Sequence, residues 1–212
     1  NQTFDKVILK PVTFAYRSIT PDFFRKGVSN FLHNLKSPVI LVNDILQGEI
    51  GRASDTVARF VINSTVGIFG LMDVAENLGF EQHNEDFGQT LAVWGFGEGP
   101  YLMLPILGPS NPRDAIGKVV DFFVDPINWW VAPDDNRIPI IRAAVSAIDL
   151  RDRLWENLEE IDKNSIDPYA SYRSLYRQRR SDEIRNGSTS QSRTDVKPTK
   201  LTYELAEPSL TE

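Results

Sequence analysis

The chain has 212 residues, a formal net charge of −6 at pH 7 and no cysteine. Its length allows one domain with at most a small appendage, and the acidic balance argues against nucleic acid as a partner, because phosphate binding needs a basic face. Without cysteine, the sequence has no disulfide framework, no thiol nucleophile and no cysteine-based zinc site.

Helical patterns dominate and strand alternation is scarce, so the sequence predicts an all-α fold. Residues 20–22 (TPD) combine an N-cap, a first-turn proline and an acid, which together predict a helix start. Residues 37–38 (SP) repeat the start signal and predict a second helix, which ends near Gly48. A third helix is expected to begin around Ile50 and to run through the apolar stretch 59–75, RFVINSTVGIFGLMDVA.

The stretch 59–75 is expected to have two unlike faces. Its charges and its Asn63 would be costly in hydrocarbon, so it is not a simple transmembrane helix. The polar and small side chains should point inward or toward a close neighbour, whereas Ile68 and Met72 point away. Either the glycines admit a neighbouring helix closely, or the segment is a wall between apolar surroundings and a polar interior. The stripe that repeats at i, i+4, i+8 and i+11 consists of Arg59, Asn63, Gly67 and Gly70.

The second half of the chain begins with an irregular segment. Residues 86–114 are apolar yet so rich in Gly and Pro that a continuous helix is excluded. A helical pattern resumes after Asp114, a long amphipathic helix is expected over 138–162, and a final helix with a tyrosine stripe should start at 167–168. From about residue 187 the chain is polar, which predicts a single domain over 1–186 and a flexible tail over 187–212.

No motif in the sequence predicts catalysis or a cofactor. The DFG triplet at 86–88 lacks the other kinase motifs, and the GFGEGP run at 95–100 lacks a following lysine or helix start. The only histidines, His33 and His83, have no partner at metal-ligand spacing, and no serine has a base at a suggestive position. The sequence therefore predicts a protein that is not an enzyme and binds no metal.

Two sets of aromatic residues can each be interpreted in two ways. The Trp129-Trp130 pair and the tyrosine stripe of the last helix are typical of a core or an interface. Trp and Tyr also favour the headgroup depth of a bilayer, because an amphipathic ring satisfies both phases.

Four blocks, in order and spacing, resemble the MlaA (VacJ) family of outer-membrane phospholipid-transport lipoproteins. The resemblance covers roughly residues 1–185, which makes it more specific than any single glycine-rich motif. The blocks are SNFLHNLKSPVILVNDILQG (29–48), RFVINSTVGIFGLMDVA (59–75), DFGQTLAVWGFGEGPYLMLPILGPSNPRD (86–114) and SIDPYASYRSLYRQR (165–179).

The resemblance implies a ring (donut) of amphipathic helices in the inner leaflet of the bacterial outer membrane, with a central amphipathic channel. Misplaced outer-leaflet phospholipids would enter this channel and pass to a periplasmic lipid carrier of the Mla pathway, and the ring would associate with a trimeric porin. The family's lipid-modified N-terminal cysteine is absent, so a leader and its anchor are expected to have been removed.

Candidate site residues follow from the resemblance together with the residue types. Residues of the 59–70 segment are expected to line the channel or to contact lipid, with the polar ones toward the headgroup and the aromatic ones toward acyl chains. A hinge or porin contact is expected at Arg113, Asp114 and Gly117, with close packing as the alternative role of Gly117. The lipid candidates are Arg59, Phe60, Asn63, Thr65, Gly67, Phe69 and Gly70.

Two other functions remain open. The chain could be a periplasmic adaptor that binds porins or other envelope proteins without conducting lipid. It could also be a lipid-modifying enzyme, against which the missing Ser/His/Asp arrangement counts.

Overall fold

The computed structural model describes residues 2–105, 107–131, 137–165 and 167–186. The tail predicted over 187–212 lies outside these residues. Among the described helices, none is both long and apolar enough to cross a membrane.

The described chain folds into a series of α-helices with two π-helical turns and one short hairpin. In the first half the order is α1 (Gln2–Phe4), η1 (Asp5–Leu9), α2 (Lys10–Ile19), α3 (Asp22–Gln47), α4 (Ile50–Thr65), α5 (Val74–Asn77) and α6 (Phe87–Val93). In the second half it is β1 (Leu102–Leu104), β2 (Gly108–Ser110), α7 (Pro112–Val124), η2 (Ile127–Val131), α8 (Arg137–Arg153), α9 (Trp155–Asn164) and α10 (Pro168–Ile184).

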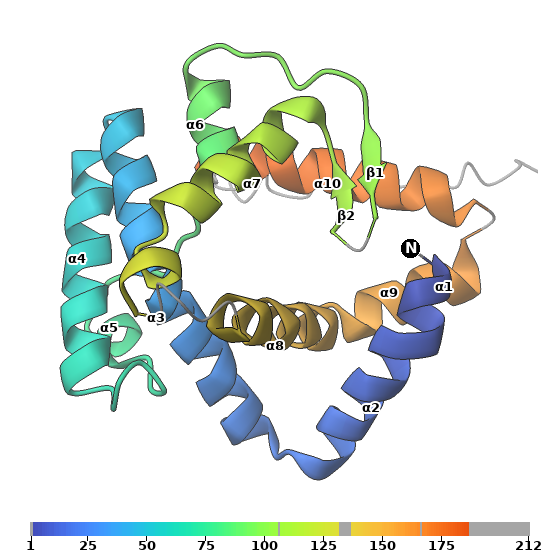
Figure 1. Cartoon of the computed structure of the whole chain (residues 1–212), viewed down its shortest axis with the longest axis horizontal. Helices are drawn as coiled ribbons and strands as arrows, with labels where there is room; N and C mark the ends of the chain where they lie inside the picture. The colour runs from blue at the N-terminus through green and yellow to red at the C-terminus, as the bar shows by residue number, and fades with distance from the viewer. Residues whose placement is uncertain (1, 106, 132–136, 166, 187–212) are drawn as a thin grey trace, which may run out of the picture.

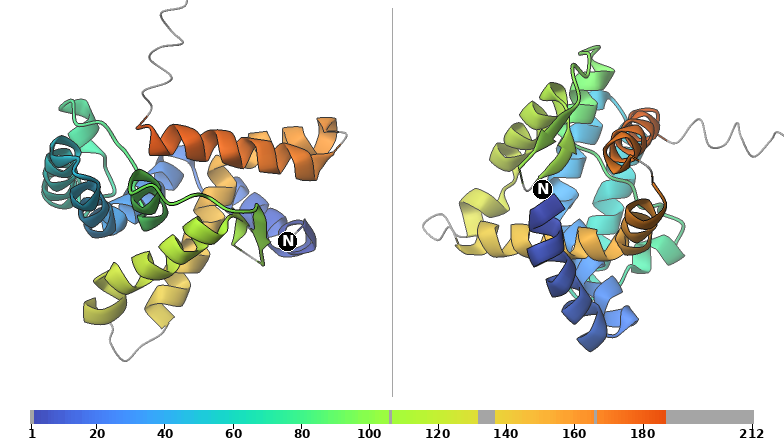
Figure 2. Two further views of the ribbon diagram at one scale, coloured as in Figure 1. Left: turned by 90° about the horizontal axis from the view of Figure 1, so that it is seen from above. Right: turned by 90° about the vertical axis from the view of Figure 1, so that its right-hand side faces the viewer.

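The helices are arranged as a ring in the view down the shortest axis (Figure 1). α3 forms one side, α6, α7 and the β-hairpin form the next, and α8 lies opposite α7. α4 stands outside this ring, against the outer side of α3. Figure 2 shows α10 on one face of the molecule, whereas the end of α7 and the start of α8 lie on the opposite side. The all-α, ring-shaped fold is therefore confirmed.

The prediction of two helices between residues 20 and 48 is wrong, because α3 runs unbroken through Pro38. Ser37 does not cap a new helix; its hydroxyl donates to the carbonyl of His33 one turn earlier, at 3.4 Å. Both Val39 and Ile40 are buried where α3 packs against its neighbours. Tertiary packing therefore holds the helix together across a proline that costs one backbone hydrogen bond.

The third predicted helix ends at Thr65, ten residues before its expected end. The backbone after it is left-handed at Ile68 (φ 52°), Phe69 (φ 57°) and Gly70 (φ 89°). A left-handed β-branched residue is uncommon and persists only where surrounding structure imposes it. Here the amide of Gly70 donates back to the carbonyl of Asn63 at 2.7 Å, which folds the chain into a tight turn.

The long helix predicted over 138–162 is divided at Leu154 into α8 and α9. At this break the guanidinium groups of Arg17 and Arg151 lie over the ring of Trp155, at 5.3 Å and 4.8 Å from its centre. Two cation–π contacts favour one fixed position of this ring. The final helix is confirmed: Asp167 caps it, with its carboxylate accepting the amide of Ala170 at 3.1 Å.

The Gly/Pro-rich segment contains α6 and a small antiparallel hairpin, in which Leu102 pairs with Ser110 and Leu104 with Gly108. No strand is predicted here from the sequence. Three-residue strands are too short to show a period-2 pattern, so alternation could not reveal them.

Candidate functional site

The distribution of polar and apolar side chains is inverted relative to an ordinary globular protein. Among the described residues, the buried hydrophobic ones are Val39, Ile40, Ala53, Ala75 and Ile161. Buried side chains are mostly polar or charged, and large apolar side chains are exposed on almost every helix. So many exposed large apolar side chains favour contact with a membrane or a protein partner. The exposed set includes Phe14, Phe23, Phe24, Phe60, Phe69, Ile116, Phe122, Phe123, Trp129, Ile140 and Ile141.

Arg59 and Asn63 are buried and held by one carboxylate. Arg59 forms an ion pair with Asp73 Oδ2 at 2.6 Å and also donates to the carbonyl of Phe80. Asn63 donates to Asp73 Oδ1 at 3.0 Å and accepts the amide of Ala75 at the same distance. Burial acts against ionisation of Asp73, but the hydrogen bonds from Arg59 and Asn63 outweigh it and lower the pKa of this carboxyl. Apart from the Nε of Arg59, which is buried without a hydrogen-bond partner, these polar groups are thus satisfied by the fold itself.

The two glycines of the stripe are sites of close approach. A Cβ on Gly67 would lie 2.3 Å from the carbonyl oxygen of Met72, and one on Gly70 would lie 2.6 Å from Cβ of Asn34. Ile68 and Met72 are exposed on the other side. The expected two-faced pattern is confirmed, although a tight turn rather than a continuous helix produces it.

The remaining candidates of this segment are exposed. Phe60 and Phe69 project outward, and Phe69 is 76% exposed. Thr65 is also exposed, with its hydroxyl donating to the carbonyl of Val61 at 2.7 Å. Because α4 stands outside α3, this segment borders the outside of the ring (Figure 1). Phe60 and Phe69 are therefore available for contacts outside the ring, whereas Arg59 and Asn63 are buried against Asp73.

Arg113 and Asp114 lie in a buried ionic network that joins α6, α7 and α10. Arg180 of α10 holds Asp86 through two hydrogen bonds of 2.7 and 2.6 Å, and its Nε lies 2.9 Å from Asp114 Oδ2. Asp114 also accepts the hydroxyl of Tyr176 and the Nε–H of Arg113 at 3.1 Å. Burial acts against ionisation of Asp86 and of Asp114, but Arg180 lowers the pKa of Asp86 well below its usual range, and Tyr176 and Arg180 lower that of Asp114.

Gly117 is the point at which α7 touches α6. A Cβ on Gly117 would lie 2.3 Å from the amide nitrogen of Gly88, and a Cβ on Gly88 would lie 2.6 Å from Nη2 of Arg180. Two glycines therefore let two helices and a guanidinium meet at one place. This geometry favours close packing as the role of Gly117, and the hinge stays a prediction.

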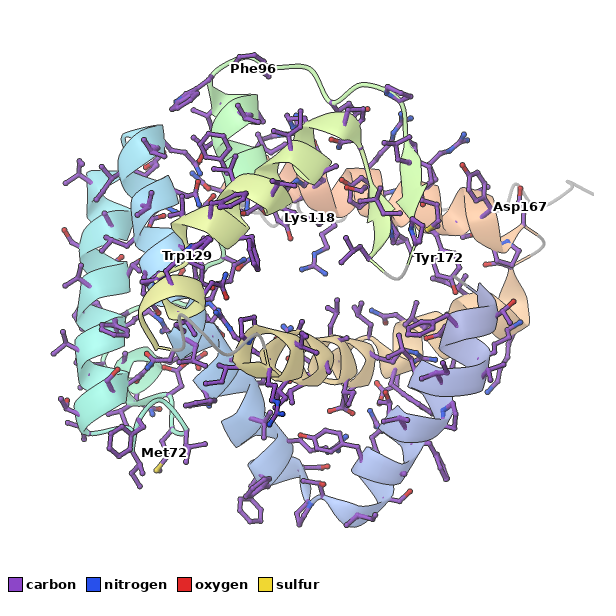
Figure 3. All side chains as sticks on the ribbon, in the orientation of Figure 1. Met72, Phe96, Lys118, Trp129, Asp167 and Tyr172 are labelled. Atoms are coloured by element: carbon purple, nitrogen blue, oxygen red, sulfur yellow. The ribbon has the colours of Figure 1, made fainter. Side chains whose placement is uncertain are left out.

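The inner side of the ring carries both charged and apolar groups. With the described side chains drawn, the middle of the ring stays open in the view of Figure 3, and Lys118 of α7 lies at its rim. The ammonium group of Lys118 donates to Ser110 Oγ at 3.1 Å, and burial lowers its pKa. A cavity of about 250 Å³ lies between α3, α7 and α8. The ring therefore presents an amphipathic interior.

Asp121 of α7 borders this cavity and is poorly compensated. Its carboxylate accepts from Asn43 Nδ2 at 3.1 Å and from the amide of Phe87 at 3.1 and 3.2 Å. Among the described residues, no Lys or Arg forms an ion pair with it. Burial, reinforced by the charge of Asp86, raises the pKa of Asp121 to about 6.

The substitution Asp121→Asn is therefore expected to stabilise the fold at pH 7.5 by about 1 kcal/mol. A carboxyl whose pKa is raised by folding destabilises the folded state as the pH rises from its unfolded pKa through its folded pKa. Asparagine does not ionise, so the substitution removes this destabilisation. Urea unfolding at pH 7.5 and at about pH 3 measures it, and the gain should nearly vanish at the lower pH, where the carboxyl is largely protonated in both states. Equal effects at the two pH values would contradict this explanation.

A second polar cluster lies between α3, α4 and the segment that follows α5. The Nε2 atom of His83 lies 3.1 Å from Asp44 Oδ2 and 3.1 Å from Thr56 Oγ1, and Thr56 donates to Asp44 at 2.6 Å. A catalytic relay needs a histidine that bridges the acid and the hydroxyl through its two ring nitrogens. Here one nitrogen makes both contacts, so the cluster is suited to holding helices together. No group of potential metal ligands occurs among the residues that the structure describes.

Sequence reasoning missed Asp86, Asp121 and Arg180. In the sequence Asp86 stands out only as part of a kinase-like triplet, and Arg180 is one of several arginines in the last helix. A lone charge between apolar neighbours in the 118–124 run, KVVDFFV, was the available signal for Asp121.

The chain matches the family model described as MlaA lipoprotein over residues 1–183. It is 33% identical over 186 residues to the intermembrane phospholipid transport system lipoprotein MlaA of Escherichia coli (strain K12), covering 86% of this chain and 72% of that protein. It is 36% identical over 181 residues to an uncharacterized protein of Rickettsia bellii (strain RML369-C), covering 85% and 70%. A solved structure from work on the structural basis for maintenance of bacterial outer membrane lipid asymmetry superposes with a TM-score of 0.72 at 32% identity, covering 85% of this chain and 90% of that one. The chain therefore belongs to the MlaA lipoprotein family.

Proposed function

We propose that this protein transports phospholipids without covalent chemistry, removing misplaced lipids from the outer leaflet of the bacterial outer membrane and so maintaining its lipid asymmetry. The observation that carries this proposal is the inverted fold, with apolar side chains outside and a charged, amphipathic interior to the ring. A lipid headgroup can cross an apolar layer only along polar groups, because an unpartnered charge there costs several kcal/mol or more. The name of the Escherichia coli relative supports the same substrate class.

The exposed apolar side chains fit a ring embedded in the periplasmic leaflet of the outer membrane. None of the described helices could span the bilayer, so the ring would occupy one leaflet, with a lipid anchor attached upstream. Lipid would pass through the ring to a periplasmic carrier of the Mla pathway, and a porin trimer would hold the ring in place. The irregular 86–114 backbone then packs against protein or faces the interior, which is where irregular structure is tolerated at membrane depth.

Phe69 offers a test of the membrane contact. The substitution Phe69→Ser removes an exposed phenyl ring whose burial in lipid would be worth about 1.5–3 kcal/mol. Cosedimentation with vesicles of phosphatidylethanolamine and phosphatidylglycerol should fall by roughly tenfold or more, whereas the unfolding midpoint should stay unchanged. The matched control is Glu81→Ser, also exposed and expected to have no effect. Undiminished cosedimentation of Phe69→Ser would place this turn outside the bilayer.

The test of the proposed function is rescue. The chain, with an anchor sequence restored, is expressed in a strain that lacks its own family member and accumulates phospholipid in the outer leaflet. Loss of this accumulation is the expected result. Wild-type levels of the chain in the outer membrane without any rescue would contradict lipid transport.

The alternative is a periplasmic adaptor that binds porins or other envelope proteins without conducting lipid. The aromatic cluster of Phe122, Phe123 and Trp129 favours it, because the three rings contact one another while staying largely exposed at the end of α7. Exposed aromatic clusters are typical of protein interfaces. Porin capture by the chain without rescue of lipid asymmetry would favour the adaptor.

A further inference from the structure

The cavity between α3, α7 and α8 combines charges of both signs. Its volume of about 250 Å³ is below the range typical for whole drug-sized ligands, so it suits a headgroup and not an entire phospholipid. The turn η2 also contributes to its lining, through Asn128. Its polar lining consists of Lys36, Asp121, Asp125, Asn128, Arg142 and Ser146.

Two of these charges compensate each other and two do not. Asp125 and Arg142 form an ion pair across the cavity wall. Among the described residues, Asp121 accepts only neutral donors, and the charge of Lys36 acts to lower its pKa although the two groups form no ion pair. The ammonium group of Lys36 donates to the neutral Asn84 Oδ1 at 2.7 Å. Within the described chain, the cavity therefore keeps one carboxylate and one ammonium group without an ion-pair partner.

A carboxylate and an ammonium group that line one cavity without contacting each other are complementary to a zwitterion. A primary ammonium group would donate hydrogen bonds to Asp121 in place of water, and a phosphate oxygen would accept from Lys36. A purely anionic ligand would leave Asp121 unpaired and would be repelled by it. A quaternary ammonium group has no N–H to donate and is better held by an aromatic cage.

We propose that this cavity binds the phosphoethanolamine headgroup of a phospholipid, with Asp121 facing the ammonium group and Lys36 the phosphate. This assignment rests on the transport function proposed above and adds a headgroup preference to it. The exposed ring of Phe122, on the rim of the same cavity, offers an apolar surface for the start of the acyl chains.

The position of Asp121 explains why such a site is preorganised. Its carboxylate is held from α3 by Asn43 and from the start of α6 by the amide of Phe87. Three elements thus fix one oxygen pair in place before any ligand arrives, and a preorganised acceptor loses little freedom on binding.

The main experiment measures lipid selectivity. Detergent-solubilised protein is incubated with equal amounts of phosphatidylethanolamine and phosphatidylglycerol, and the bound lipids are quantified by mass spectrometry. Wild-type protein should enrich phosphatidylethanolamine. Asp121→Asn should reduce that enrichment several-fold, and Lys36→Gln should reduce the binding of both lipids, because both carry the phosphate. The matched controls are Asp182→Asn and Lys26→Gln, whose parent side chains are exposed on α10 and α3.

Ala143→Phe is a second variant that leaves every charge intact. Ala143 is an exposed residue of the cavity wall, so the larger ring should fill the cavity without disturbing the fold, and phosphatidylethanolamine enrichment should be lost. Near-UV and far-UV circular dichroism verify the fold of each variant. Folded Asp121→Asn and Ala143→Phe with wild-type selectivity would overturn the headgroup site.

A soluble probe distinguishes whether the cavity binds an intact lipid or a free headgroup. Glycerophosphoethanolamine should compete with the lipid weakly, and glycerol 3-phosphate more weakly still. If glycerophosphoethanolamine binds as tightly as the intact lipid, the occupant is a free solute and the lipid assignment fails. If wild-type protein binds both phospholipids without preference, the headgroup site fails while transport stands. If it binds no phospholipid at all, the proposed function itself fails.

Discussion

The substitution Arg180→Ala should lower the free energy of unfolding by about 3–5 kcal/mol. Arg180 is 8% exposed and is the shared counter-charge of Asp86 and Asp114, so its removal leaves the Asp86 carboxylate without its ion-pair partner and, within the described residues, Asp114 with Arg113 alone. Native domains are stable by only about 5–15 kcal/mol, so this loss should release α10 from the ring or unfold the protein. Urea titration of the detergent-solubilised protein, followed by circular dichroism, measures the change.

The neighbouring residue provides the control. The side chain of Arg179 is 59% exposed and, among the residues that the structure describes, pairs with Glu183 alone, so Arg179→Ala should change stability by no more than about 0.5 kcal/mol. The effect of Arg180→Ala should also shrink as the pH falls below about 4. The pKa values of Asp86 and Asp114 are lowered by folding, so their contribution is present above the unfolded pKa and is lost as the carboxyls take up protons. Equal midpoint shifts for the two arginine variants would contradict the network.

The second large effect is expected from Gly117→Ala. The added Cβ would lie 2.3 Å from the amide nitrogen and 2.7 Å from Cα of Gly88, and backbone atoms cannot rotate out of the way as a side chain can. α7 would have to move off α6, at a cost of about 1–3 kcal/mol or more. This penalty should exceed the roughly 1 kcal/mol that alanine gains over glycine within a helix. Thermal unfolding should show a clearly lower midpoint.

Gly51 is the matched control for Gly117. It also lies in a helix, α4, and a Cβ there would meet nothing within 4 Å, so Gly51→Ala should stabilise the protein by about 0.4–1 kcal/mol. The pair also separates the two roles considered for Gly117. If Gly117 acts as a hinge, Gly117→Ala should leave the thermal unfolding midpoint unchanged and impair lipid transport. That result would contradict close packing as its role.

Features encoded in short stretches were predictable. The final helix begins where an acid and a proline stand together at residues 167–168, and the structure has that cap. The unlike faces of 59–75 also follow from residue spacing, since Arg59 and Asn63 are buried while Ile68 is exposed.

Features that depend on distant residues were not predictable. Pro38 and the turn at Ile68 both depart from local preference, because packing against other elements outweighs about 1–3 kcal/mol of backbone cost. Arg180 and Asp86 are 94 residues apart, and no local pattern indicates which of several arginines meets which acid. The ring itself was expected only from the resemblance to a family.

The polar interior has a calorimetric consequence. The heat capacity increase on unfolding arises mainly from apolar surface that becomes hydrated, at about 12–15 cal/mol/K per residue in ordinary globular domains. Because few apolar side chains of the described chain are buried in its interior, unfolding in the absence of lipid or detergent should show a smaller increase per residue. A smaller heat capacity change flattens the dependence of stability on temperature. An envelope protein of this design would keep nearly the same margin of stability across the range of temperatures that its host meets.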